Sequence, residues 1–529
     1  MTDVDLSFHG YKYFPYERRF AELEVSRLLG AMPHEVNGSL HVRTVNGVDR
    51  DLVHRLTYFH QAVIGAETTV IPQQARLEAS STVHDDPSRL RRQRTRYSAH
   101  GLHEYRGKFN PQMVRASFNL LGLQTGGRVW DPFCGSGTVL LEALHQGFSA
   151  IGVDLNPLAV SIANAKLAAL RARPQLLQDA VDRIAAELDA YPELIGEDTL
   201  PDDKTIVRNL GDEWMSAFTC GEYLASWFPR AVLAQLRLIL DSIDRVVPPS
   251  VRGIFRIVLS DIVRDVSWQD PGDLRIRRRK DPALNYPAGR LFLSNLRDRV
   301  NTIVAAREHL VGPRFWQRAF EGSSCDSNSL QAKARSFLSD GVDCVLSSPP
   351  YATALPYIDT QRLSLALLGL ATPEVIRQLD SALVGSREIS TSSRRAIELA
   401  IDCNEARLSR STWDLCKRLK MAYDPESDGF RRQNTPAVVY RYFDGMTRAM
   451  AQATHFLRPG GWLAFIVGPN ATTLGGQDFL IDTPALLAST GEHVGLELVE
   501  MHELDTYSRF DVHSRNSIRE ERLLIMRKP

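Results

Sequence analysis

The sequence has no net charge, because 63 Lys and Arg residues balance 63 Asp and Glu residues. An acidic partner such as nucleic acid would therefore have to meet local basic clusters, since the surface as a whole is not basic. None of the six cysteines belongs to a Cys-x-x-Cys pair, so neither a typical zinc site nor a dithiol redox motif is indicated. No run of about 18 apolar residues occurs, so we expect no membrane-spanning helix.

Two further absences concern the compartment. The first ten residues, MTDVDLSFHG, lack the basic and apolar segments of a secretory signal. No disulfide framework is indicated, and Cys134 and Cys344 lie inside two of the motifs described below, as expected of reduced thiols in a cytosolic enzyme. We therefore expect a cytoplasmic protein with no membrane partner.

The length of 529 residues suggests roughly two to four domains, and an apolar content of 43% is ordinary for a globular protein. Residues 1–98 are expected to form a small N-terminal α/β region. Apolar spacing predicts a helix over residues 16–29, and short strands are predicted at residues 39–45 and 68–71. No catalytic constellation is evident in this region.

A buried strand is predicted at residues 342–346, just before Pro349 and Pro350. Proline lacks a backbone N–H and cannot continue a central ladder. Ligands of open α/β sheets bind beyond the carboxyl ends of strands, which places the Ser348 hydroxyl, the Pro349 carbonyl and the Tyr351 ring at a predicted site. Such groups could hold a flat base and polarise its exocyclic amine, although a strand that simply ends in a Pro-Pro turn would look the same.

Residues 128–138, RVWDPFCGSGT, predict a short strand that ends at Asp131, a glycine-rich turn and then a helix. A second strand, at residues 150–153, is followed by Asp154, which lies 19 residues after Gly135. This is the spacing of an acid that binds ribose hydroxyls. A dinucleotide enzyme would also fit, but the third glycine of that fingerprint is missing, because position 140 is leucine.

Two segments are strongly basic. Residues 89–96 contain five arginines and residues 275–280 contain five basic residues, and neither segment contains an acid. Arginine clusters bind phosphate well, although a solvated linker or loop has the same composition. The DNA-binding residues predicted here are Arg91, Arg92, Arg94, Arg275, Arg277, Arg278, Arg279 and Lys280.

Three motifs together resemble a known family. DPFCGSGT, at residues 131–138, resembles the cofactor-binding motif of S-adenosylmethionine-dependent amino methyltransferases of DNA. SPPY, at residues 348–351, resembles their catalytic motif in the form typical of cytosine-N4 enzymes. Residues 103–111 are similar to the segment that covers the methionine part of the cofactor. The resemblance covers about half of the chain, at residues 99–172 and 316–529.

The resemblance implies an α/β fold, with the seven-stranded Rossmann-like sheet of class I methyltransferases, and S-adenosyl-L-methionine as cofactor. The implied catalytic residues are Ser348, Pro349, Pro350 and Tyr351. The implied cofactor-binding residues are Lys108, Phe109, Asp131, Pro132, Phe133, Gly135, Ser136, Gly137, Thr138, Asp154, Asn156 and Asp326. No metal ligand is implied.

The resemblance also divides the chain. Residues 99–172 would be the cofactor-binding half of the core and residues 316–529 the catalytic half, which ends in a predicted hairpin. Residues 173–315 are expected to be a large helical insertion that, in this family, usually holds the target-recognition region; a purely structural subdomain is the alternative. A second helical insertion is expected at about residues 372–435.

The implied activity is site-specific transfer of a methyl group to N4 of cytosine in duplex DNA, after the base is flipped out of the helix. Alternatives are an N6-adenine DNA methyltransferase, an RNA guanine-N2 methyltransferase and a nucleic-acid-binding protein with a degenerate core. Cytosine-C5 chemistry is disfavoured, because no Pro-Cys dipeptide occurs. The recognition sequence, a restriction endonuclease partner and the choice between monomer and homodimer stay open.

Overall fold

The computed structural model describes residues 1–45, 47–65, 68–81, 93–105, 107–195, 200–270, 272, 276–280, 287–310, 315–352, 358–429, 432–505 and 520–529. Its centre is a seven-stranded sheet of order β13-β14-β10-β9-β6-β7-β8. The strands are β6 Arg128–Asp131, β7 Ser149–Asp154, β8 Gln317–Glu321, β9 Val342–Ser347, β10 Leu457–Val467, β13 Glu497–Asp505 and β14 Glu520–Arg527. The predicted seven-stranded Rossmann-like methyltransferase sheet is thus confirmed.

The sheet is parallel from β10 to β8, and β14 runs antiparallel between β10 and β13. At its centre Val129 of β6 pairs with Cys344 of β9, although the two strands are far apart in the sequence. Strand order reverses between β6 and β9, and such a switch point is where ligands bind in open α/β sheets. The loops that follow β6 and β9 carry the two main sequence motifs.

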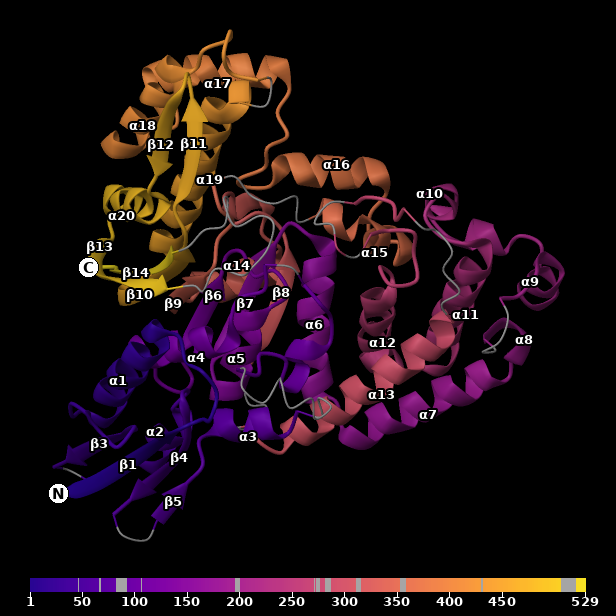
Figure 1. The fold of residues 1–529 in the computed structure, drawn as a ribbon, viewed down its shortest axis with the longest axis horizontal. Coiled ribbons are helices and arrows are strands. Elements are labelled where there is room, and N and C mark those ends of the chain that lie inside the picture. Colours follow the sequence, from indigo (N-terminus) through magenta and orange to yellow (C-terminus); the bar gives the residue numbers. More distant parts are fainter. Residues whose placement is uncertain are drawn as a thin grey trace.

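Helices cover both faces of this sheet (Figure 1). One face packs against α4 Pro111–Leu120, α5 Thr138–Gln146 and α6 Pro157–Arg171, and the other against α14 Ala332–Ser339, α19 Thr435–Phe456 and α20 Thr483–His493. In the central strands β6, β7 and β9 most side chains are apolar and buried, as expected of a parallel sheet covered on both faces.

Residues 1–79 form a second sheet that lies beside the first (Figure 1). It is antiparallel, of order β2-β3-β1-β4-β5, and is packed by three helices. The elements are β1 Thr2–Phe8, α1 Pro15–Leu29, β2 His34–Val36, β3 Ser39–Thr44, α2 Arg50–Arg55, β4 Phe59–Ile64, β5 Thr68–Val70 and α3 Gln73–Ala79. The predicted helix and two strands are present; β1, β2 and β4 were not predicted, although Val4, Leu6 and Phe8 of β1 alternate with polar residues as in a half-buried strand.

Helices fill the segment between β7 and β8 that follows α6. They are α7 Pro174–Asp189, α8 Pro192–Ile195, α9 Asp203–Leu210, α10 Gly221–Ala225, α11 Arg230–Val246, α12 Pro249–Ile262 and α13 Ala288–Arg307. Pro229 separates α10 from α11, because proline disrupts a helix interior. Figure 1 shows these helices extending from the core as one arm, with α12 packed on α6.

A second arm rises above β10 and β14 (Figure 1). It consists of α17 Thr391–Cys403, α18 Arg410–Ala422 and a hairpin of β11 Asn470–Leu474 and β12 Gln477–Ile481. The short helices α15 Arg362–Leu367 and α16 Pro373–Ala382 precede it. No helix in the described part of the chain is long and apolar enough to cross a membrane.

Candidate active site

A cavity of about 320 Å³ opens along the carboxyl edge of the seven-stranded sheet. Its lining follows the strand order. After β8 come Gly322 to Cys325, at and after the end of β7 come Asp154 to Asn156, and after β6 come Pro132, Phe133 and Gly135. After β9 come Ser348 to Tyr351, and the remaining strands contribute Ile466 near the end of β10, Glu521 at the start of β14 and Leu504 near the end of β13. One hollow therefore contains both motif loops. Its volume is within the range of about 300–1,000 Å³ that small-molecule sites have.

The glycine-rich loop after β6 is held by the acid at the end of β7. The Asp154 carboxylate accepts the backbone N–H of Gly135 at 2.8 Å and that of Asn156 at 2.8 Å. Gly135 and Gly137 have positive φ angles of 46° and 77°, and a Cβ on Gly137 would lie 2.6 Å from Cβ of Ala163. Glycine is therefore required at position 137 both by the backbone and by the neighbouring helix.

Asp131 lies beneath the two motif loops and joins them. Its Oδ1 accepts from the Ser347 hydroxyl at 2.7 Å and from the Phe133 N–H at 3.1 Å. Burial raises the pKa of Asp131 to about 7. Asp131 does not line the cavity, so it aligns the ends of β6 and β9 and leaves ligand contacts to its neighbours.

The catalytic-motif segment presents its side chains to the cavity. Ser348, Pro349, Pro350 and Tyr351 all line it, and Ser348 is half-buried. The Tyr351 hydroxyl donates to Glu521, which comes from β14 and lines the same cavity. The tyrosine ring is thus anchored on the side of the sheet that carries β14.

The buried Lys166 and the half-buried Lys108 support the cofactor side of the cavity. Lys166 of α6 donates from Nζ to the Ser136 carbonyl at 2.9 Å and to Ser136 Oγ at 3.2 Å, and burial lowers its pKa to about 7. Lys108 donates to the carbonyls of Thr95 and His100 at 2.9 and 3.3 Å. Burial lowers the pKa of Lys108 far below its usual value, and its stem lines the cavity.

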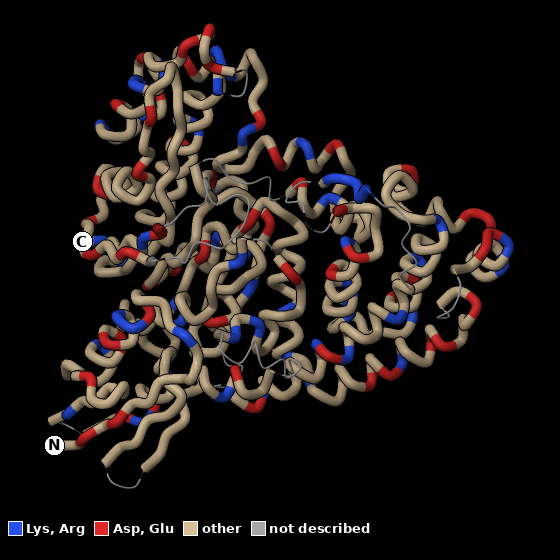
Figure 2. Tube along the Cα trace, in the orientation of Figure 1, with Lys and Arg blue, Asp and Glu red and all other residues tan. Residues whose placement is uncertain are grey.

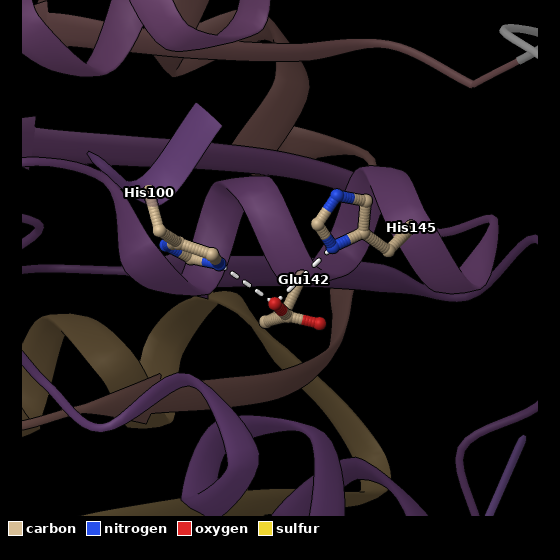
Figure 3. Close-up of side chains that lie close together, drawn as sticks. All are labelled: His100, Glu142 and His145. Atoms are coloured by element: carbon tan, nitrogen blue, oxygen red, sulfur yellow. Dashed lines mark hydrogen bonds and ion pairs between the residues drawn. The ribbon is translucent and has the colours of Figure 1, made fainter. Parts of the chain in front are cut away.

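A cluster of His100, Glu142 and His145 lies fully buried behind the glycine-rich loop, and Figure 3 shows both imidazoles turned towards the carboxylate. Their possible ligand atoms all lie within 4.8 Å of one another, and no other group of this kind occurs among the described residues. Glu142 Oε1 already accepts from Tyr97 and His100 at 2.7 Å, and Oε2 accepts from Arg115 at 3.1 Å. The guanidinium charge opposes a cation here, so the geometry favours a hydrogen-bonded hub.

The electrostatics of Glu142 agree with that interpretation. Burial alone would raise the pKa of its carboxyl, but the charges of His145 and Arg115, with hydrogen bonds from both histidines, hold it well below its usual value. The hydrogen bonds to Glu142 connect residues 97–100 to α5. Residues 97–100 precede the cofactor-covering segment, and α5 begins at the glycine-rich turn.

The predicted cofactor residues fall into three groups: residues that line the cavity, buried residues that do not, and one exposed residue outside the cavity. Lys108, Phe109, Pro132, Phe133, Gly135, Asp154 and Asn156 line the cavity. Asp131, Ser136, Gly137 and Thr138 are buried and do not line the cavity. Asp326 is exposed and its Oδ1 accepts from the Asn328 N–H at 2.8 Å, so it caps a turn outside the cavity while its neighbour Cys325 lines it.

The predicted DNA-binding residues have unequal surroundings. Arg279 donates to the carbonyls of Gln269, Arg264 and Asp265 at 2.9, 3.1 and 3.0 Å. Arg278 donates to the Ser226 carbonyl and lies 5.3 Å from the ring centre of Trp227.

Arg94 donates to the Glu78 carbonyl at 3.0 Å. Arg277 and Lys280 are exposed. Arg91, Arg92 and Arg275 lie outside the described residues.

Sequence reasoning missed several polar lining residues, among them Ser323 and Ser324 after β8 and three residues from other elements. Tyr16 comes from α1, Asn110 caps α4 and Glu521 begins β14. Asn110 followed by Pro111 is a helix-start signal that could have been found. Tyr16 and Glu521 carry no local signal, because only the packing of distant segments brings them to the motif loops.

The cavity fits the cofactor that the motifs imply. A carboxylate offers about four lone-pair positions, and the Gly135 and Asn156 amides leave room at Asp154 for ribose hydroxyls. Burial raises the pKa of Asp154, although the backbone N–H donors oppose that shift. The aromatic rings of Tyr105, Phe109 and Phe133 and the hydroxyls of Ser323 and Ser324 suit a flat, partly polar ligand.

Known proteins share parts of this chain. A family model described as the RMKL-like methyltransferase domain, UPF0020, matches residues 102–190. The Type II methyltransferase M.MvaI of Kocuria varians is 21% identical over 386 residues, which are 70% of this chain and 77% of that protein. The Type II methyltransferase M.MjaII of Methanocaldococcus jannaschii is 41% identical over 76 residues, 14% of each chain.

Other relatives are more distant or local. The tRNA (guanine(10)-N2)-dimethyltransferase of Methanothermobacter thermautotrophicus is 40% identical over 52 residues, 10% of this chain and 16% of that protein. TrmN from Thermus thermophilus superposes over 100% of both chains at 11% identity with a TM-score of 0.29, which is too low to support an argument.

Strand order, motif geometry and the domain match together define the class. The chain has the class I methyltransferase fold and contains a methyltransferase domain that spans the glycine-rich loop and Asp154. It is a methyltransferase, and its cofactor is S-adenosyl-L-methionine.

Proposed function

We propose that this protein is a site-specific DNA methyltransferase that transfers a methyl group to N4 of cytosine in duplex DNA. One observation carries the proposal: Ser348 to Tyr351 and Asp154 line the same cavity from nearby strand ends. A group bound at Asp154 would therefore face the catalytic segment. The similarity to M.MvaI, a Type II methyltransferase, supports DNA as the substrate.

The catalytic segment has the hydrogen-bonding character that an amine needs. Pro349 and Pro350 have no backbone N–H, so this stretch offers mainly acceptors: the Ser348 hydroxyl and the Pro349 carbonyl. When bound, the cofactor supplies an electrophilic sulfonium methyl group. Ser348 Oγ and the Pro349 carbonyl would accept the two amino N–H bonds and localise the nitrogen lone pair, and their fixed position supplies most of the acceleration.

A base within a duplex cannot reach this cavity, so we propose that the target is flipped out of the helix. Tyr351 would stack on the extruded base, and its bond to Glu521 holds the ring ready. Ser348 is a neutral acceptor whose side chain is one atom shorter than aspartate. This favours a pyrimidine amine held close to the Pro349 carbonyl.

Residues 173–315 are proposed as the target-recognition region. The basic residues Arg277 and Lys280 lie on its exposed surface. The outer helix α7 carries four acidic residues and one arginine, and Figure 2 shows this acidic row on the outside of the arm. DNA would therefore approach the side of the arm away from α7.

Two alternatives keep specific support. An N6-adenine enzyme would use the same cavity, because adenine also presents an exocyclic amine. An RNA guanine-N2 methyltransferase is favoured by the local 40% identity to the tRNA dimethyltransferase. A nucleic-acid-binding protein with a degenerate core is less well supported, since the glycine turn, Asp154 and the catalytic segment keep their geometry.

The restriction-modification role rests on the Type II relatives alone. If it holds, the functional partner would be a restriction endonuclease with the same recognition sequence. Its test is resistance of DNA from an expressing host to endonucleases of known specificity.

The test of the reaction is direct. The purified protein is incubated with methyl-labelled cofactor and with duplex DNA, single-stranded DNA or tRNA, and the product is digested and its nucleosides are weighed by mass spectrometry. We expect N4-methyldeoxycytidine from duplex DNA only. Label confined to deoxyadenosine would establish the adenine alternative, and label confined to tRNA would establish the RNA alternative.

A further inference from the structure

The N-terminal region reaches into the active site through one residue. Tyr16, in the first turn of α1, lines the cavity together with Ser348, Tyr351 and Glu521. Tyr16 is buried, with 8% of the residue exposed.

The ring of Tyr16 is held in place on both sides. Phe14 stacks on it with ring centres 5.6 Å apart, and Phe20 meets it edge-on at 5.8 Å. The cap of α1 is closed by Glu17, whose carboxylate accepts the Phe14 N–H at 2.8 Å. Rigid aromatic packing of this kind aims a hydroxyl at low entropic cost.

Helix α1 is fastened to the catalytic sheet, so the position of Tyr16 belongs to the site. Arg19 donates to the Glu503 carbonyl at 2.8 Å, and Arg27 pairs with Glu500 at 2.9 Å. The Phe20 ring also contacts His502 edge-on at 5.5 Å. All three contacts are with β13, which lies next to β14 in the sheet, so Tyr16 is held on the side of the sheet from which Glu521 comes.

The chemistry of the phenol complements that of the catalytic segment. Ser348 and the Pro349 carbonyl act as acceptors, and Glu521 is an acceptor already bound by Tyr351. Burial, and after it the charges of Glu17 and Glu521, raises the pKa of Tyr16 far above its usual value, so its hydroxyl keeps its proton and can donate. Tyr16 is thus a hydrogen-bond donor on a wall made largely of acceptors.

We propose that Tyr16 is a specificity-determining residue of the base pocket, whose hydroxyl donates to N3 of the flipped cytosine, the ring acceptor beside the amino group. This inference rests on the proposed function and assigns the N-terminal region a part in substrate recognition. A base without an acceptor at this position would offer the Tyr16 hydroxyl no partner and would be rejected.

Three proteins test the inference: wild type, Tyr16→Phe and Tyr13→Phe. Tyr13 is the matched control, because its hydroxyl bonds to the Tyr58 carbonyl at 2.7 Å inside the N-terminal region and does not line the cavity. Single-turnover methylation of a duplex that contains the target site is compared with affinity for S-adenosylhomocysteine. We expect Tyr16→Phe to lose about three- to tenfold in methylation rate, the worth of one neutral hydrogen bond, while cofactor-product affinity stays within about twofold.

A second substrate distinguishes a direct contact between Tyr16 and the base from an indirect, structural effect of the substitution. The affinities of cofactor-product-bound wild type and Tyr16→Phe are measured for a duplex with cytosine and for one with 3-deazacytosine at the target, which has C–H in place of N3. Wild type should bind the cytosine duplex more tightly than Tyr16→Phe does, but the two proteins should bind the 3-deazacytosine duplex equally well. Equal activity of wild type and Tyr16→Phe, equal losses in Tyr16→Phe and Tyr13→Phe, or an advantage that persists on the 3-deaza duplex would each overturn the inference. A wild type that methylates no DNA would instead overturn the proposed function.

Discussion

The hydroxyl of Ser347 donates to Oδ1 of Asp131 at 2.7 Å, and this bond joins the ends of β9 and β6. Ser347 is fully buried, whereas its neighbour Ser348 lines the cavity. Because side chains alternate along a strand, a shift of one residue would exchange their roles. The bond to Asp131 therefore helps to fix which of two adjacent serines faces the substrate.

Alanine substitutions at these two serines should affect different quantities: the methylation rate for Ser348 and the stability of the fold for Ser347. Ser348→Ala should lower single-turnover methylation by about 100-fold, because it removes a group aimed at the reacting amine, and it should leave cofactor binding unchanged. Ser347→Ala should lower the free energy of unfolding by about 1–3 kcal/mol, because Asp131 loses a buried partner. Thermal unfolding, calorimetry and rapid-quench assays measure the three quantities. Equal effects of the two changes on rate and on stability would contradict the assignment.

Asp154→Ala should weaken cofactor binding, because it removes both the proposed ribose acceptor and the anchor of the Gly135 N–H. We expect a loss of at least about tenfold in affinity, the equivalent of about 1.4 kcal/mol. Titration calorimetry with S-adenosylmethionine measures it, with the exposed acid Asp189→Ala as control. An unchanged affinity would remove Asp154 from the cofactor site.

Lys166 should give the protein a characteristic pH dependence. Its folded pKa of about 7 lies below the value of about 10.4 expected in the unfolded chain, so between these values the unfolded state binds more protons. The contribution of this group to the unfolding free energy then rises with pH, by up to about 1.4 kcal/mol per pH unit, and is least favourable below pH 7. Lys166→Met should remove that slope.

Chemical denaturation between pH 6 and 10 measures the slope for Lys166. The difference in stability between wild type and Lys166→Met should grow in favour of wild type as the pH rises through this window. Lys204→Met, at an exposed position on α9, serves as the control and should give a curve parallel to wild type. A parallel curve for Lys166→Met would show that the lysine is equally protonated in both states.

The basic segment should divide into DNA contacts and structural residues. Replacing Arg277 and Lys280 with alanine should reduce the log–log salt slope of DNA binding by roughly 0.9 for each lost phosphate contact. Arg279→Ala should instead destabilise the fold, because its guanidinium holds three backbone carbonyls. Fluorescence anisotropy across a salt series, with the exposed Arg183→Ala as control, measures the slope. An unchanged slope would mean that this surface faces away from DNA.

Much of the core could be predicted because its signals are local. The strand before Asp131, the glycine-rich turn and the strand that stops before Pro349 each follow from neighbouring residues, since glycine and proline act on their own backbone. Less could be predicted in the N-terminal region. There the alternating Val4, Leu6 and Phe8 of β1 could have been recognised, but β4 carries no clear period, and the pairing of the two strands depends on distant residues.

The sequence by itself determined the seven-stranded core, the glycine-rich loop and the catalytic segment, because each depends on the steric and hydrogen-bonding character of adjacent residues. Only the tertiary structure decided that Asp326 lies outside the cavity, that Arg279 is tied to backbone carbonyls and that Tyr16 and Glu521 complete the wall opposite the cofactor side. Tyr16 and Glu521 are separated by almost the whole chain. They share a cavity because α1 packs on β13 and β14 lies beside it, and such pairing is set by the burial of complementary surfaces, which no local pattern records.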